Sequence, residues 1–363
     1  MIYIYITLIS SFIGIIFLFY NEKEINEMGL VYYKSKTKLV IEMLIVSLPF
    51  FIISSFRYYV GTDYGGYSSN QIPAVLMGKV VKVEVLYKLV IKLGYLLYPS
   101  NYQVIFILTT LLIVLFSFMY IFDRSYNVPA SVLLFTLTTF FNFSMNGMRQ
   151  AIATSIFLFA TKYIVEGKPL RYFTWILIAV GFHSSALIFF PLYLIRKFRF
   201  SMAKLPVFVI VVILAHFFKN LVFILMNKFG LYTEYLNSYY GAGNNKIFLL
   251  NIMMLLLVLL VLLIKGSSVL KNNNLNVDVN ILLYLILVQI FLNGIPNSNR
   301  ILLLLFPIAM TLVPNFISEL REVLLKYASY VLIFASFSYY FVYTILINNF
   351  QGTLPYAWWL FWK

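Results

Sequence analysis

The sequence contains no cysteine, only two histidines and few charged residues of either sign. Without cysteine the chain has no disulfide, thiolate metal site or cysteine nucleophile, and two histidines argue against a histidine-rich metal site. Charged residues are 11% of the chain, whereas about 25% is usual in soluble domains. Because 62% of the 363 residues are hydrophobic, the composition indicates a membrane protein and excludes a separate soluble domain.

The charge that is present is mostly positive: 27 lysines and arginines against 12 acidic residues give a net charge of +15. In a soluble domain such an excess would suggest nucleic-acid binding. In a membrane protein, lysine and arginine gather in the cytoplasmic loops. This rule accounts for most of the excess, so we expect no nucleic-acid partner.

Ten apolar runs are long enough to cross a bilayer as helices. They are Ile2–Tyr20, Leu39–Phe56, Gln103–Phe122, Pro129–Met145, Gln150–Glu166, Leu205–Phe223, Ile247–Ile264, Val279–Asn293, Ile301–Ser318 and Ala328–Leu346. We therefore expect an all-α polytopic membrane protein in which residues 1–363 form a single integral membrane domain. Four lysines follow the first run, which predicts an outer N-terminus and a cytoplasmic loop 21–38.

A further apolar segment, 172–195, has basic clusters on both sides. If this segment crosses the membrane once, 13 lysines and arginines lie inside and 14 outside; if it is a hairpin, 16 lie inside and 11 outside. We therefore expect a re-entrant hairpin that turns near Gly181–Ser185. Non-helical backbone at membrane depth is tolerated only where it lines a cavity, so the tip itself indicates a site.

Residues 57–102, placed outside by this topology, end in an amphipathic segment at 83–97. One face of this segment carries apolar residues and the opposite face carries Lys88 and Lys92. The apolar positions are Leu86, Leu89, Val90, Leu93 and Leu97. The pattern predicts a helix that lies in the membrane interface.

Three arginines, Arg57, Arg149 and Arg300, lie on the outer face against the positive-inside rule. Asn146 precedes Arg149, and Asn297 and Asn299 precede Arg300, as candidate caps of helices that enter the membrane. A helix N-terminus with an added guanidinium suits phosphate oxygens. The alternative is that these arginines extend to lipid headgroups.

The stretch Phe56–Tyr67 places a carboxylate, Asp63, among glycines and tyrosines. Flexible backbone, aromatic faces and an acid suit sugar recognition. The alternative is an Asx-type turn with interfacial tyrosines.

His183 lies at the expected hairpin tip, where an ionisable group is a functional hypothesis by default. A neutral histidine bonded to Ser185 or to a backbone carbonyl is the competing interpretation. His216 lies in the middle of an apolar run beside Phe217, so we interpret it as structural.

The chain lacks the sequence motifs of several enzyme classes. The chain has no Asp-x-Asp, Walker loop, His-Glu-x-x-His or Gly-x-Ser-x-Gly sequence. Nucleotide donors are also absent outside the cytoplasmic membrane. A transferase acting there must use a donor that is attached to lipid.

Six short motifs occur in one order along nearly the whole chain. They are Phe56-Arg57, Gly61–Tyr64 with Tyr67, Asn146–Ala153, Phe182–Leu187, Asn299-Arg300 and Pro355-Tyr356. Each alone is weak, but their order and spacing are specific. Together they resemble the EpsG family of bacterial exopolysaccharide and capsule polymerases, which are Wzy-like membrane proteins.

The resemblance implies a metal-independent membrane glycosyltransferase, without cofactor, in the bacterial cytoplasmic membrane. It would join polyprenyl-diphosphate-linked oligosaccharide units on the outer side. Its partners would be that lipid-linked substrate, the bilayer, and a chain-length regulator and flippase of the same pathway.

On this interpretation, fixed positive charge must stabilise the departing diphosphate, and a base must take the acceptor proton. Arg149 and Arg300 are the main candidates for the diphosphate, with Arg57 as the third. Asp63 or His183 is the catalytic base, with a preference for Asp63. The remaining substrate contacts are expected at Tyr64, Tyr67, Glu84 and Gln150.

Two other functions would use similar residues. A transporter or flippase of lipid-linked oligosaccharides would also need basic residues for phosphate and tyrosines for sugar. The unusual polar residues collect on one face, however, whereas a flippase needs a charged path open to both. An O-antigen-type ligase is the other alternative.

Overall fold

The computed structural model describes residues 1–363 except 19–21, 229–244, 294–298 and 360–363. The described chain is helical almost throughout, which confirms the all-α fold class. Its one sheet is a two-stranded antiparallel hairpin of β1 (Lys23–Ile25) and β2 (Val31–Tyr33), with Glu24 opposite Tyr32.

The first half of the chain holds a series of long helices interrupted by short ones. In order these are α1 (Ile2–Leu18), α2 (Lys36–Ser55), a π-helical turn η1 (Gly66–Gln71), α3 (Ile72–Leu76), α4 (Val85–Leu97), α5 (Gln103–Arg124), α6 (Val128–Leu137), α7 (Phe140–Asn146), α8 (Met148–Glu166), α9 (Pro169–Phe182) and a 3₁₀ helix η2 (Ser184–Lys197).

The second half continues in the same manner. Its helices are η3 (Met202–Lys204), α10 (Leu205–Lys228), α12 (Asn245–Lys265), η4 (Ser267–Lys271), α13 (Asn273–Phe291), α14 (Asn299–Leu305), η5 (Phe306–Ile308), α15 (Ala309–Ser318), α16 (Val323–Phe341) and η6 (Val342–Ile347).

Each of the ten predicted runs overlaps at least one helix of the structure. Seven described helical segments are long and apolar enough to cross a membrane, or eight if α6 and α7, which meet at a bend of 50°, form one span. The first run forms the shorter α1. The fifth forms α8, in which Arg149, Gln150 and Lys162 lower the mean hydropathy.

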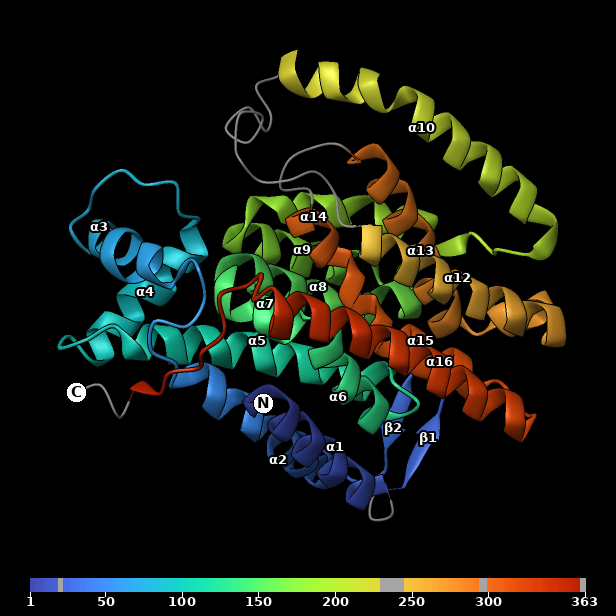
Figure 1. Ribbon diagram of the computed structural model, residues 1–363, viewed down its shortest axis with the longest axis horizontal. Helices are drawn as coiled ribbons and strands as arrows, with labels where there is room; N and C mark the ends of the chain where they lie inside the picture. The colour runs from blue at the N-terminus through green and yellow to red at the C-terminus, as the bar shows by residue number, and fades with distance from the viewer. Residues whose placement is uncertain (19–21, 229–244, 294–298, 360–363) are drawn as a thin grey trace.

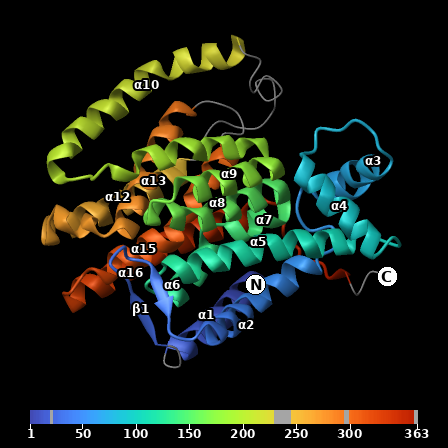
Figure 2. The same cartoon turned by 180° about the vertical axis from the view of Figure 1, so that it is seen from behind.

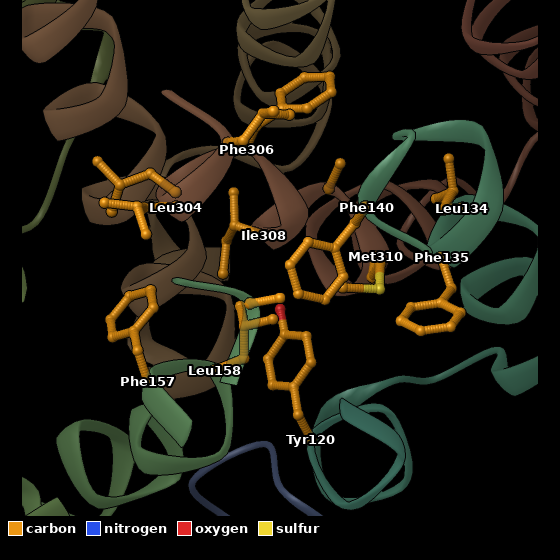
Figure 3. Packing of buried hydrophobic residues seen from close by; sticks show 14 of the residues in the cluster. Tyr120, Leu134, Phe135, Phe140, Phe157, Leu158, Leu304, Phe306, Ile308 and Met310 are labelled. Atoms are coloured by element: carbon orange, nitrogen blue, oxygen red, sulfur yellow. The ribbon is translucent and has the colours of Figure 1, made fainter. Parts of the chain in front are cut away.

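The core lies around α8, which packs against α5, α9, η2 and α13. Figure 3 shows how aromatic and aliphatic side chains of α5, α6, α7, α8 and the α14–α15 region interdigitate. The rings of Phe157 and Phe189 stack with their centroids 3.8 Å apart, which joins α8 to η2. By contrast, α10 runs along one edge of the bundle (Figures 1 and 2), and only 6% of its apolar stretch is buried.

The helices α9 and η2 form the hairpin predicted at 172–195. They pack against each other and meet at His183, whose extended backbone (φ −158°, ψ 125°) ends one helix and begins the other. The Tyr172 hydroxyl donates to the Phe189 carbonyl at 2.6 Å, and Phe173 stacks on Phe190 with centroids 5.6 Å apart. These contacts hold the tip in one place.

The amphipathic segment at 83–97 forms α4, but its inner face differs from the predicted leucine stripe. Tyr87, Ile91 and Gly94 face α5 and α9, whereas Leu89 and Leu93 are about half exposed. Gly94 explains the difference, because a Cβ there would lie 2.5 Å from Cγ1 of Ile105. A residue without a side chain lets α4 approach α5 closely, which leaves the leucines for the membrane interface.

A fully buried ion pair joins four helices at the other end of the bundle. Nη2 of Arg124, at the end of α5, lies 2.7 Å from Oδ1 of Asp278 in α13, and both side chains are 0% exposed. The guanidinium also donates to Thr161 of α8 at 2.8 Å and to Asn274 of α13 at 2.6 Å. Asn315 of α15 donates to the Arg124 carbonyl at 2.9 Å. This network fixes the relative positions of α5, α8, α13 and α15.

The buried pair makes a prediction about stability. Asp278→Leu leaves the Arg124 charge buried without its carboxylate, and breaking such a pair costs about 3–5 kcal/mol. The purified variant in detergent should therefore unfold at a clearly lower temperature. The exposed Glu22–Lys34 pair provides the control, because Glu22→Leu should leave the unfolding temperature unchanged. Equal unfolding temperatures for Asp278→Leu and the parent would contradict this role.

The predicted topology is also testable, because single cysteines can be placed in this cysteine-free chain. Ser69→Cys, outside on this topology, should react with an impermeant thiol reagent in intact cells. Thr37→Cys and Ser267→Cys should react only after the membrane is opened. Labelling of Ser267→Cys in intact cells would show that 172–195 crosses the membrane once and that the re-entrant hairpin is wrong.

Candidate functional site

A polar pocket of about 320 Å³ opens at the end of the bundle that carries α3, α4 and α7 (left in Figure 1, right in Figure 2). Its lining comes from separate parts of the chain. The lining residues are Thr62, Asp63, Gly66, Tyr67, Gln71, Gly147, Arg149, Gln150, His183 and Arg300. Six of the nine site residues expected from the sequence therefore meet in one pocket.

The loop that carries Asp63 is fixed by Asn146. Oδ1 of Asn146 accepts from the Thr62 hydroxyl at 2.7 Å and from the Asp63 backbone N–H at 2.8 Å. Gly61 permits this approach because its φ is +103° and a Cβ there would lie 2.7 Å from the Met145 carbonyl oxygen. Asn146 was expected to cap α8, but Gly147 occupies that position without a side-chain hydrogen bond. The amide positions the acidic loop instead.

A C-terminal strap, residues 351–359, supports the same loop from behind. The Gly61 and Thr62 N–H groups donate to the carbonyls of Gly352 and Gln351 at 2.8 and 3.1 Å. The side-chain Nδ2 of Asn146 donates to Oε1 of Gln351 at 2.8 Å. The Tyr356 hydroxyl, from the Pro355-Tyr356 motif, donates to the Ile53 carbonyl at 2.9 Å. The strap therefore supports the loop that carries Asp63 but contributes no residue to the lining of the pocket.

Asp63 faces Arg300 across the pocket. Nη2 of Arg300 lies 3.2 Å from Oδ2 of Asp63, and each side chain is about one third exposed. Gln150 donates from Nε2 to the Arg300 carbonyl at 2.9 Å, which ties the start of α14 to the start of α8. Of the other expected caps, Asn297 lies outside the described residues. Asn299 is the first residue of α14, and its buried Oδ1 has no hydrogen-bond partner in the described part of the chain.

Arg149 is more buried and has a different partner. Its Nη1 contacts Oε2 of Glu84 and donates to the Lys82 carbonyl at 3.2 Å. The other Glu84 oxygen accepts from the Ser184 N–H at the hairpin tip, at 3.2 Å. Glu84 thus joins the start of α4 to α8 and to η2, at the edge of the pocket.

His183 is in the neutral form that the sequence left as an alternative. Its Nδ1 accepts from the Ser185 N–H at 3.2 Å and lies 2.7 Å from the Ser185 hydroxyl oxygen. Because a backbone N–H can only donate, the neutral ring keeps its proton on Nε2. Burial lowers the pKa of His183 to about 4, with Arg149 and Arg300 adding to this and Glu84 opposing it. His183 therefore offers an N–H donor near neutral pH.

The structure does not bring Arg57 and Tyr64 to the pocket. Arg57 is 1% exposed, lies over the Phe106 ring at 5.2 Å and donates to the Met148 sulfur at 2.9 Å. Tyr64 stacks on the same Phe106 ring, with the two ring centroids 4.6 Å apart. Both residues pack behind the acidic loop, so neither contacts a ligand in the pocket directly.

Four lining residues were not among the expected site residues: the glycines Gly66 and Gly147, and the polar residues Thr62 and Gln71. Oε1 of Gln71 is buried and lacks a hydrogen-bond partner in the described part of the chain. Gln71 follows the polar run Ser68–Asn70 in the sequence, and only that run could have indicated that Gln71 lines a polar pocket. Across the described residues, no group of three or more histidine, aspartate or glutamate side chains is placed to hold a metal ion.

Comparison with known proteins identifies one family. Searches of curated proteins and of solved structures give no significant match. A family model, described as the EpsG family, matches residues 40–358. This range includes every residue that lines the pocket. The chain therefore belongs to the EpsG family, whose members are polymerase-type membrane proteins of exopolysaccharide synthesis.

Proposed function

We propose that this protein polymerises lipid-linked oligosaccharides on the outer side of the bacterial cytoplasmic membrane. The observation that carries the proposal is the convergence of Asp63, Arg149, His183 and Arg300 in one polar pocket at an end of a membrane bundle. Membership of the EpsG family supports it independently. The donor is a growing glycan on polyprenyl diphosphate, and the acceptor is a newly delivered lipid-linked unit.

The reaction forms one glycosidic bond and breaks one bond to phosphate. The acceptor hydroxyl oxygen attacks the anomeric carbon of the donor sugar, and the polyprenyl diphosphate leaves with the bonding electron pair. Negative charge develops on the departing oxygen and requires fixed positive groups nearby. We assign this role to Arg149 and Arg300, and the fact that both residues line the same pocket supports the assignment.

Asp63 is our candidate for the base that takes the acceptor proton. Its loop is held on both sides, by Asn146 and by the strap, so the carboxylate is aimed at the pocket before substrate arrives. The contact of 3.2 Å between Nη2 of Arg300 and Oδ2 of Asp63 holds the carboxylate at the pocket. His183 presents its Nε2–H and suits donation to a sugar hydroxyl or a phosphate oxygen.

The overall proposal is tested by reconstitution. Purified protein in lipid vesicles is incubated with its lipid-linked repeat unit, and the products are separated by size. A ladder of glycans with released polyprenyl diphosphate supports the proposal. Movement of intact substrate across the vesicle membrane without a ladder would favour a transporter instead.

The arginines are expected to act through charge-assisted hydrogen bonds worth about 1.5–3 kcal/mol each. Arg149→Ala or Arg300→Ala should lower kcat/KM for polymerisation by about 10- to 100-fold while expression stays normal. Lysine should restore activity only partly, because it lacks the planar fork of donors. Arg321→Ala, at an exposed position outside the pocket, is the matched control. Full activity in Arg149→Ala would instead support the alternative interpretation, in which Arg149 extends to lipid headgroups.

Asp63 and His183 can be separated by their conservative variants. A positioned base contributes typically about 10²–10⁴-fold to rate, so Asp63→Asn should nearly abolish chain growth with substrate still bound. His183→Gln keeps a hydrogen-bond donor and should be the milder change. Because the pKa of His183 is about 4, the activity profile should show no step near pH 6.5 from this residue. Normal rates in Asp63→Asn with none in His183→Gln would make His183 the base.

A further inference from the structure

Both pocket arginines already have carboxylate partners. Arg300 pairs with Asp63, and Arg149 pairs with Glu84. The pKa of His183, about 4, leaves that ring neutral near pH 7. The two guanidinium groups and the two carboxylates of these pairs therefore cancel in charge. A diphosphate, which carries two or more negative charges, finds no net positive charge until one pair opens.

The two carboxylates differ in how they are held. The Asp63 backbone is fixed by Asn146 through the N–H bond of 2.8 Å, and the proposed reaction needs its carboxylate in the pocket. Glu84 precedes α4, and its side chain forms no cap bond with its own helix. Its carboxylate instead binds the Arg149 guanidinium and the Ser184 N–H, which is 3.2 Å away.

These two donors are of the kind that bind phosphate. A guanidinium and a backbone N–H offer a phosphate oxygen the same charge-assisted hydrogen bonds that they give to the Glu84 carboxylate. The carboxylate thus stands where a phosphate oxygen would be bound. It also repels any phosphate that approaches Arg149 while it remains there.

We propose that Glu84 is an internal counter-ion of Arg149, displaced by the diphosphate of the substrate. This proposal rests on the proposed function. It adds that, when substrate binds, Arg149 and the Ser184 N–H exchange their hydrogen bonds to Glu84 for hydrogen bonds to a phosphate oxygen. The exchange selects for ligands with more than one negative charge, because a ligand with a single carboxylate must compete with Glu84 on equal terms. It also releases α4 from the hairpin tip.

The direction in which Kd for a diphosphate changes when Glu84 loses its charge tests this role. Glu84→Gln keeps the shape of the side chain but removes its charge, so Arg149 should bind anions more readily. With farnesyl diphosphate as the probe and purified protein in nanodiscs, Glu84→Gln should lower Kd at least about threefold relative to the parent. Glu22→Gln makes the same charge change at an exposed pair and should leave Kd unchanged. Arg149→Gln should weaken binding.

Other results would overturn the proposal. If the parent binds farnesyl diphosphate and Arg149→Gln weakens it, but Glu84→Gln binds equally or more weakly, Glu84 is a permanent support of Arg149. Glu84→Ala repeats the test with a side chain that has no amide. If neither Glu84 variant folds, Glu84 is again a permanent structural support of Arg149. If neither the parent nor Glu84→Gln binds the probe, releasing Arg149 creates no diphosphate site. The proposed function then loses its main support as well.

Discussion

The buried Arg124 guanidinium imposes the constraint on which the arrangement of the bundle depends. A charge that is removed from water must find a partner for its donors, and Arg124 finds them on α8 and α13 while its carbonyl binds Asn315 of α15. The first turn of α8, at its other end, carries Arg149 and Gln150, and the first turn of α14, which leads to α15, carries Arg300. The network around Arg124 fixes the relative positions of these helices at one end of the bundle. It thereby also fixes the positions of the pocket residues that the same helices carry at the other end.

Much of the architecture could be predicted because membranes impose simple rules. Apolar runs of about 20 residues indicate helices, and the distribution of lysine and arginine favoured a hairpin at 172–195. The helical hairpin with its turn at His183 follows that expectation. Arg57, Arg149 and Arg300 stood out because they broke the positive-inside rule, and Asp63 stood out as an acid among glycines and tyrosines; Asp63, Arg149 and Arg300 line one pocket, whereas Arg57 does not.

The remaining details depend on packing that composition does not encode. A guanidinium beside tyrosines can line a pocket or lie behind it, and Arg57 lies behind because the Phe106 ring and Met148 sulfur enclose it. Asn146 has the residue type and position of a helix cap, yet its amide meets the backbone of a loop more than 80 positions earlier in the chain. The face that α4 presents depends on the missing side chain of Gly94. Each of these outcomes is decided by a partner that is distant in sequence.

The strap has a consequence for how the protein is made. Its residues pair with the loop that carries Asp63, and the Tyr3 hydroxyl donates to the Thr353 carbonyl, 350 positions later. During synthesis, the acidic loop leaves the ribosome before the strap, and it gains these hydrogen-bond partners only after the helices between them have been made. A chain that stops before residue 351 lacks the support of this loop. In such a chain Asp63 would be unsupported, and the pocket would be completed only when residues 351–359 have been synthesised.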